Sequence, residues 1–150
     1  MLETAFMLIP LLAILFGIFD YAVVVFLKNT MQFAVREGVR YAITSQTMSG
    51  MNHDASIKQV VMNNSMGFAN LLSPTGNGLG QIAITYYNPA TMNVVSGSGS
   101  NVGGNIVVVA ANGLRWRWMA PVLHNATPVT FSVSSAGIME ATPIGGAPTR

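Results

Sequence analysis

The chain opens on a long run of apolar residues that changes character about halfway. Within residues 1–27 only Glu3 and Asp20 carry charge, so every side of a helix built from this stretch would be apolar. After Lys28 the apolar residues recur at spacings of three and four, which is the pattern of a helix with one buried face. We therefore expect one continuous helix over residues 2 to about 45, with a first half that must be hidden in lipid or protein.

The two halves of this helix carry different packing signals. Pro10 lies inside the apolar half, and a proline there is tolerated in lipid or in a packed bundle, where neighbours satisfy the freed carbonyl. Gly17 is small enough for another helix to approach closely. The second half carries an apolar stripe that should pack on a globular part, made of Met31, Val35, Gly38 with Val39, and Ala42.

The charged residues of the apolar half predict specific partners, because an unpaired charge is costly in an apolar environment. Glu3 either meets the N-terminal ammonium of an adjacent subunit or sits at the membrane surface, where the helix dipole favours a carboxylate. Asp20 is expected to pair with Lys28 of another helix or to face a polar groove. Which partner Glu3 takes separates an assembly role from a simple anchor.

A second polar group ends the helix. Glu37 can pair with Arg40 at i,i+3, and this pair sits off the apolar stripe together with Arg36. With Tyr41 these residues could dock a partner helix or the chain's own sheet. A structural ion-pair cluster is the simpler interpretation, and nothing in the spacing indicates catalysis.

Beyond residue 45 the pattern predicts a mixed head. A second helix is expected over about 54–72, with Asn52 or Asp54 as its N-cap. The period then changes to two, which predicts strands at 81–88, at 105–119 with a bulge or bend at Asn112-Gly113, and at 128–140. The expected fold is α+β: a long apolar N-terminal helix over residues 1–45, and a head over 46–150 with a second helix, a three-or-so-stranded antiparallel sheet and an extended tail.

The end of the second predicted strand alternates strictly. Arg115 and Arg117 fall on one face, and Trp116 and Trp118 fall on the other. The tryptophans either form an interfacial anchor or subunit contact, or they pack over a helix, and we expect packing for at least one of them. The arginines would then face solvent or a neighbour.

Composition narrows the function classes. Charged residues make up 8% of the chain against about 25% in an ordinary soluble domain, and 51% is hydrophobic, so much of the surface is expected to be covered by lipid or protein. The net charge of +2 arises from few charges of either sign and not from clustered Lys and Arg, which argues against nucleic acid as a partner. The absence of cysteine excludes thiolate sites. His53 beside Asp54, with the distant His124, lacks metal-ligand spacing, so we expect no catalytic residue, metal, cofactor or small-molecule substrate.

The motifs of the first helix resemble those of the TadE-like family, pilin-like proteins of the tight-adherence (Flp-type) pilus systems of bacteria. The resemblance rests on the opening Glu3, on Pro10, on Gly17 with Asp20, and on the block Arg36-Glu37-Gly38-Val39-Arg40-Tyr41-Ala42. It is strong over the helix and loose over the head. In processed members the glutamate lies further from the cleavage point than Glu3 lies from the start. Either a leader and two residues precede this sequence, or its precursor differs.

The resemblance implies a structural protein rather than an enzyme. It would be inserted in the bacterial inner membrane and then assemble through its N-terminal helix, with copies of itself or other pilin-like subunits, into a surface filament or secretion machinery. The alternative is a bitopic membrane protein that never polymerises and acts as an assembly factor through a periplasmic head.

Overall fold

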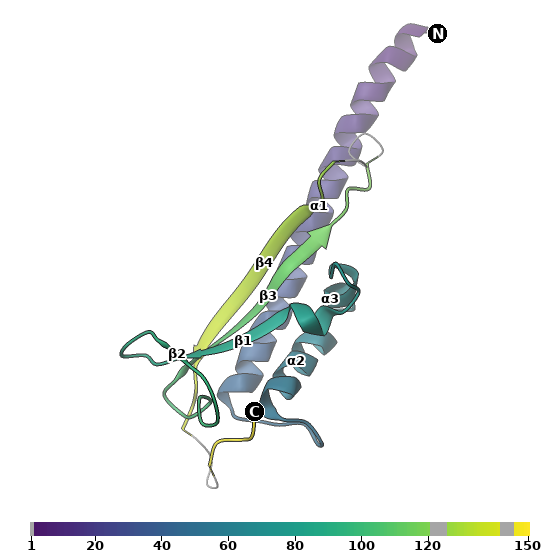
Figure 1. Cartoon of the computed structure of the whole chain (residues 1–150). Helices are drawn as coiled ribbons and strands as arrows, with labels where there is room; N and C mark the ends of the chain where they lie inside the picture. Colours follow the sequence, from purple (N-terminus) through teal and green to yellow (C-terminus); the bar gives the residue numbers. More distant parts are fainter. Residues whose placement is uncertain (1, 121–125, 142–145) are drawn as a thin grey trace.

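The computed structural model of the chain shows a long helix with a packed head along its second half (Figure 1). It describes residues 2–120, 126–141 and 146–150, with side chains from residue 6 onward. The helix, α1, runs from Leu2 to Ile43. The head comprises α2 (His53–Asn64), α3 (Phe68–Leu71), the 3-10 turn η1 (Gly78–Gln81) and the strands β1 (Ile82–Tyr87), β2 (Val94–Val95), β3 (Ile106–Trp116) and β4 (Val129–Ile138). The α+β prediction is confirmed.

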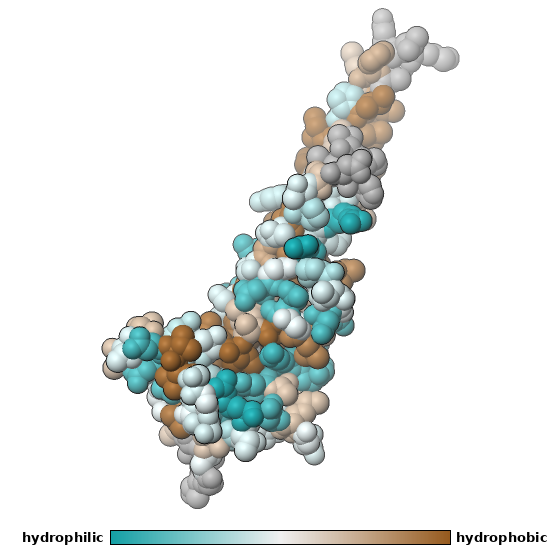
Figure 2. All heavy atoms as spheres, viewed as in Figure 1, coloured by the Kyte–Doolittle hydropathy of each residue, from teal (hydrophilic) through white to brown (hydrophobic). Residues whose placement is uncertain are grey.

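The first half of α1 projects beyond the head as a bare apolar rod. The residues from Phe6 to Leu12 are all exposed, and Figure 2 shows hydrophobic side chains along this projecting end. Over Phe6–Ile43 the helix is long and apolar enough to cross a membrane, and only 6% of its most apolar stretch is buried. This half is therefore not the core helix of a soluble domain, whose apolar residues would be covered.

The second half of α1 is the central element of the core. Its predicted stripe is confirmed, because Met31, Val35 and Ala42 are fully buried and Val39 is nearly so. The stripe packs against β3, β4 and α2. Burying one side chain of this size contributes about 1.5–3 kcal/mol, so the stripe is a major attachment of the head to the helix.

The sheet is antiparallel and has the order β2-β1-β3-β4 in the described chain. Its inner face carries Val107, Val109 and Leu114 into the core. The register of β3 against β4 shifts between Ala111 and Leu114, and Gly113 has a φ of +64° there. The predicted irregularity at Asn112-Gly113 is therefore a β-bulge.

The predicted second helix over 54–72 is broken in two. Asn52, one of the two residues predicted as the N-cap, takes this role, and its side chain accepts a hydrogen bond from the amide of Ala55. The helix ends at Asn64 because Met66 and Gly67 adopt left-handed conformations, with φ values of 54° and 83°. A left-handed residue cannot continue a right-handed helix, so α3 starts as a separate turn.

The contact between α1 and α2 depends on Gly38. A Cβ at this position would lie 2.5 Å from Val61 Cγ2, closer than two carbons can approach. We expect Gly38→Ala to lower the stability of the head by about 1–3 kcal/mol through overpacking, measured as the denaturation midpoint in detergent. Gly17→Ala is the matched control, because no atom in the described part of the chain lies within 4 Å of its added methyl group. Equal midpoints for the two variants would contradict this packing.

Candidate functional site

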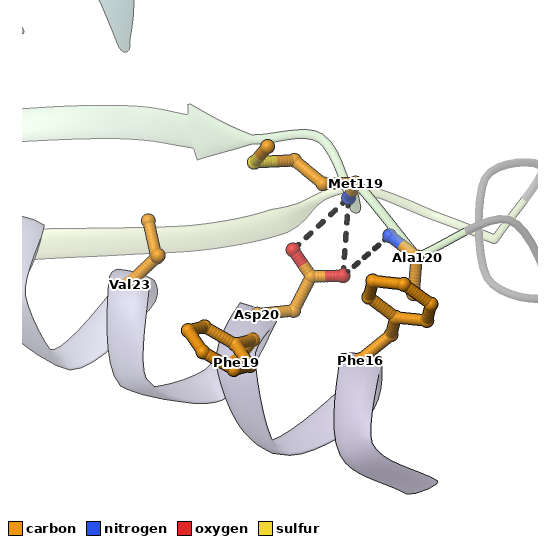
Figure 3. Close-up of a pocket in the computed structure, with 6 residues that line it drawn as sticks. All are labelled: Phe16, Phe19, Asp20, Val23, Met119 and Ala120. Atoms are coloured by element: carbon orange, nitrogen blue, oxygen red, sulfur yellow. Dashed lines mark hydrogen bonds between the residues drawn. The ribbon is translucent and has the colours of Figure 1, made fainter. Parts of the chain in front are cut away.

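The apolar rod and the head are joined at Asp20, which is only 2% exposed. Its Oδ2 accepts hydrogen bonds from the backbone amides of Ala120 at 2.7 Å and Met119 at 3.1 Å, and its Oδ1 accepts from the Met119 amide at 3.0 Å (Figure 3). The two amides follow the end of β3 and point at the helix. A carboxylate in the middle of an apolar helix is thus bound to a loop that lies 100 residues later in the sequence.

This contact satisfies a group that would otherwise be very costly to bury. An isolated carboxylate in an apolar environment requires partners, and hydrogen bonds from neutral donors to a charged acceptor are about twice as strong as those between neutral groups. Successive backbone amides supply such donors without adding a second charge. The contact therefore fixes the far end of the sheet against α1, beyond the reach of the apolar stripe.

An apolar hollow of about 370 Å³ lies beside Asp20 at this junction. Its lining combines one face of α1 with the loop after β3, and Figure 3 shows the rings of Phe16 and Phe19 beside Asp20. Both rings are exposed, at 45% and 65%. The hollow is therefore a surface where another apolar segment can pack directly against the point that joins rod and head.

The structure places the other predicted helix residues as follows. Glu37 and Arg40 form the predicted i,i+3 ion pair at 3.2 Å, but the Arg40 side chain is 75% exposed, so the pair contributes little to stability. Tyr41 is half-buried against the core, whereas Arg36 is exposed. Only Tyr41 of this group therefore reaches the chain's own core.

The remaining predicted residues of α1 lie towards its N-terminus, away from the Glu37–Arg40 pair. The helix continues unbroken through Pro10, and no atom of the described residues lies within 4 Å of a Cβ placed on Gly17. Lys28 is exposed and has no carboxylate partner within the described residues, so its pairing with another helix stays a prediction. The side chain of Glu3 lies outside the described residues, and its partner also stays a prediction.

The alternation at the end of β3 is confirmed. Arg115 and Arg117 are exposed, whereas Trp116 and Trp118 are half-buried. Trp116 packs against the core, and the indole N–H of Trp118 donates to the carbonyl of Thr127 at 3.1 Å. At least one tryptophan packs inward, as expected.

A polar cluster at the opposite end of the head was not predicted. The Tyr86 hydroxyl donates to Asp54 Oδ1 at 2.9 Å, and Arg150 binds Asp54 Oδ2 through Nη2 at 2.8 Å and Nε at 3.0 Å. The Arg150 guanidinium also lies 4.6 Å from the centroid of the Tyr86 ring. The Nδ1 atom of His53 lies 3.2 Å from Asn101 Nδ2. We call these five residues the C-terminal latch.

The C-terminal latch holds the end of the chain. The amide of His53 donates to the Thr149 carbonyl at 2.8 Å, and Asn101 donates to the Pro148 carbonyl at 2.8 Å. Burial raises the pKa of Tyr86, and the charge of Asp54 raises it further. A buried, hydrogen-bonded tyrosine of this kind has a structural role. Among the described residues no group of three or more His, Cys, Asp and Glu could hold a metal ion.

Comparison with known proteins supports the resemblance found in the helix. The family model described as "TadE-like protein" matches residues 1–40, which confirms the predicted resemblance over that segment. The match covers the rod, Asp20 and the ion-pair region up to Arg40, and it ends before the head. No curated protein and no solved structure matches the chain.

The Asp20 contact can be tested by removing its charge. Asp20→Asn keeps the size of the side chain but replaces one acceptor oxygen by an amino group that faces backbone N–H donors. We therefore expect the free energy of unfolding to fall by about 1–3 kcal/mol. Hydrogen exchange of a peptide ending at Ala120 should rise, because its amides lose their acceptor. Glu37→Gln, at a largely exposed ion pair, is the charge-matched control and should leave that peptide unchanged. Equal protection in Asp20→Asn would show that the carboxylate does not hold the loop.

The C-terminal latch predicts a pH dependence. Burial lowers the pKa of His53 below its ordinary value of 6.5; the Asp54 charge and the Ala42 carbonyl oppose this shift, and Arg150 reinforces it. The unfolded chain therefore binds a proton at higher pH than the folded head does. Stability should be full above pH 6.5 and fall as the pH drops towards the lowered pKa.

Urea midpoints between pH 7 and pH 5 measure this effect. The fall of the urea midpoint from pH 7 to pH 5 should be smaller in His53→Gln than in the unmodified chain, whereas His124→Gln should show the full fall. A His53→Gln decline as steep as that of the unmodified chain would rule out His53 as its source.

Proposed function

We propose that this chain is a pilin-like structural subunit of a bacterial pilus system. The exposed half of α1 holds it in the inner membrane before assembly, and the same surface packs against the helices of other subunits afterwards. The match to TadE-like proteins over residues 1–40 supports a place in such a system. The role is structural, and no part of the proposal involves catalysis.

One observation carries this proposal. A single helix, α1, is bare and apolar over its first half and forms the core of the head over its second half. The two functions share one rigid element, and Asp20 fastens the head at the point where they meet. A head fixed in this way cannot swing freely about its anchor, so packing the rods of several subunits would also set the positions of their heads.

The driving force for such assembly is close packing. Lipid tails are as apolar as the rod, so moving the rod from lipid into a bundle gains van der Waals contact rather than hydrophobic transfer. Gly17 offers the small surface that such contact needs. The charge of Asp20 is already bound by the chain's own amides, so a neighbouring rod can approach it without leaving a carboxylate unpaired. Glu3 would then pair with the N-terminal ammonium of the adjacent subunit.

Cysteine cross-linking tests the proposal, because the chain has no cysteine of its own. Ile18 is 66% exposed on the rod. We expect Ile18→Cys to give oxidant-dependent dimers in cells, since rods packed side by side bring copies of this position together. Fibres of uniform width in negative-stain micrographs of purified material would support the same conclusion.

Asn77→Cys, in an exposed turn of the head, is the matched control for random collision. Membrane-bound Ile18→Cys that cross-links no more than Asn77→Cys would favour the alternative, a bitopic assembly factor that does not polymerise. Failure of the chain to fractionate with membranes would contradict both proposals.

A further inference from the structure

We propose that the end of the head beside Asp20 rests on the surface of an anionic phospholipid bilayer. The contact residues are Arg115, Arg117, Trp118 and Met119, which we call the membrane-facing tip. The proposal rests on the membrane anchoring of α1 given above, and it adds a second, specific contact between the head and lipid headgroups.

The length of the rod places the tip at the bilayer surface. The uncharged stretch from Thr4 to Phe19 rises about 24 Å as a helix, which is shorter than a hydrocarbon core of about 30 Å. A bilayer that covers this stretch therefore reaches the level of Asp20. Since Asp20 binds the amides of Met119 and Ala120, the loop after β3 must lie at that same level (Figures 1 and 3).

The two arginines of the tip are free to bind phosphate. Both are exposed, and neither has a carboxylate partner in the described part of the chain. With Trp116 they line a hollow of about 350 Å³, completed by Leu71, Ser73, Pro74 and Pro128. A guanidinium presents a planar set of donors that matches a phosphate, and it interacts with an anionic headgroup through both charge and hydrogen bonds.

The apolar residues of the tip fit the same environment. Met119 is 68% exposed although its neighbour Ala120 is buried. Trp118 is half-buried, with its N–H satisfied by the Thr127 carbonyl. Tryptophan is enriched where hydrocarbon meets headgroups, because its ring is apolar and its N–H needs a polar partner. The arginines on one side of the strand end, and Trp118 with the exposed Met119 beyond it, are residue types that suit the interface of a bilayer.

The distribution of charge favours lipid over a second copy of the chain as the occupant. Beside the tip, Asp20 is enclosed by backbone amides. The described acids of the head region lie away from it: Glu37 pairs with Arg40, Asp54 belongs to the latch, and Glu140 donates its amide to Ile43 at the end of α1. A second copy would therefore have to present one of these distant acids to the arginines, whereas an anionic bilayer presents phosphates at the correct level.

Tryptophan fluorescence tests the proposal directly, because Trp116 and Trp118 are the only tryptophans of the chain. The full chain would be reconstituted in vesicles of phosphatidylcholine with and without phosphatidylglycerol, using lipids brominated near the headgroup or near the centre of the bilayer. We expect the shallow label to quench at least about two-fold more than the deep label, as for an interfacial indole. Phosphatidylglycerol should increase the shallow quenching.

Arg117→Gln should lose the increase that phosphatidylglycerol causes, whereas Lys58→Gln, the same charge change on α2, should keep it. A chain that floats with the vesicles but shows no bromine quenching would overturn the docking and leave the anchoring of α1 intact. A chain that does not float would overturn both. A third outcome is that the tryptophans show no bromine quenching but become better shielded from acrylamide as the protein-to-lipid ratio rises. This outcome would show that the membrane-facing tip contacts a second copy of the chain instead of lipid.

Discussion

The arrangement of this protein depends on a buried carboxylate and two backbone amides. Without the Asp20 contact, the head would be held to α1 by the apolar stripe and by polar contacts further along the helix, such as the bond from Gln32 Nε2 to the Ser134 carbonyl at 2.8 Å. The end of the sheet nearest the rod would then have no polar attachment to the helix. Because Asp20 accepts at 2.7–3.1 Å from Met119 and Ala120, the last turn of the rod and the end of β3 are one unit. The apolar hollow and the arginine-tryptophan surface are both positioned by this contact.

Two opposing demands on α1 explain its composition. Under the proposed function, the rod would have to be apolar on every side to be stable in lipid, and yet neighbouring rods would need features by which to recognise one another. The chain meets both demands by confining polar groups to the ends of the rod, with Glu3 at one end and Asp20 at the other. The low charged fraction of 8% fits the same proposal, since a surface covered by lipid or by neighbours has little use for charge.

The elements set by local periodicity were predictable, and those set by distant pairing were not. The stripe of α1 follows from spacings of three and four, the bulge from Asn112-Gly113, and the two faces of β3 from strict alternation. The break at Met66-Gly67 was missed because an isolated glycine is tolerated inside a helical pattern. The partner of Asp20 could not be predicted, since every residue except proline carries the same backbone amide. The C-terminal latch was missed because Arg150 and Asp54 lie 96 residues apart, and only the adjacent His53-Asp54 hinted at it.

The C-terminal latch also bears on how the chain is made. Residues 148–150 contact His53, Asp54, Tyr86 and Asn101, so the C-terminal latch cannot close until residues 148–150 have been synthesised. The apolar helix α1, by contrast, precedes the whole head in the sequence and therefore leaves the ribosome before the head does. Under the proposed function, α1 would enter the membrane while the sheet that covers its second half does not yet exist. The order of synthesis would thus give the membrane access to α1 before the head competes for it.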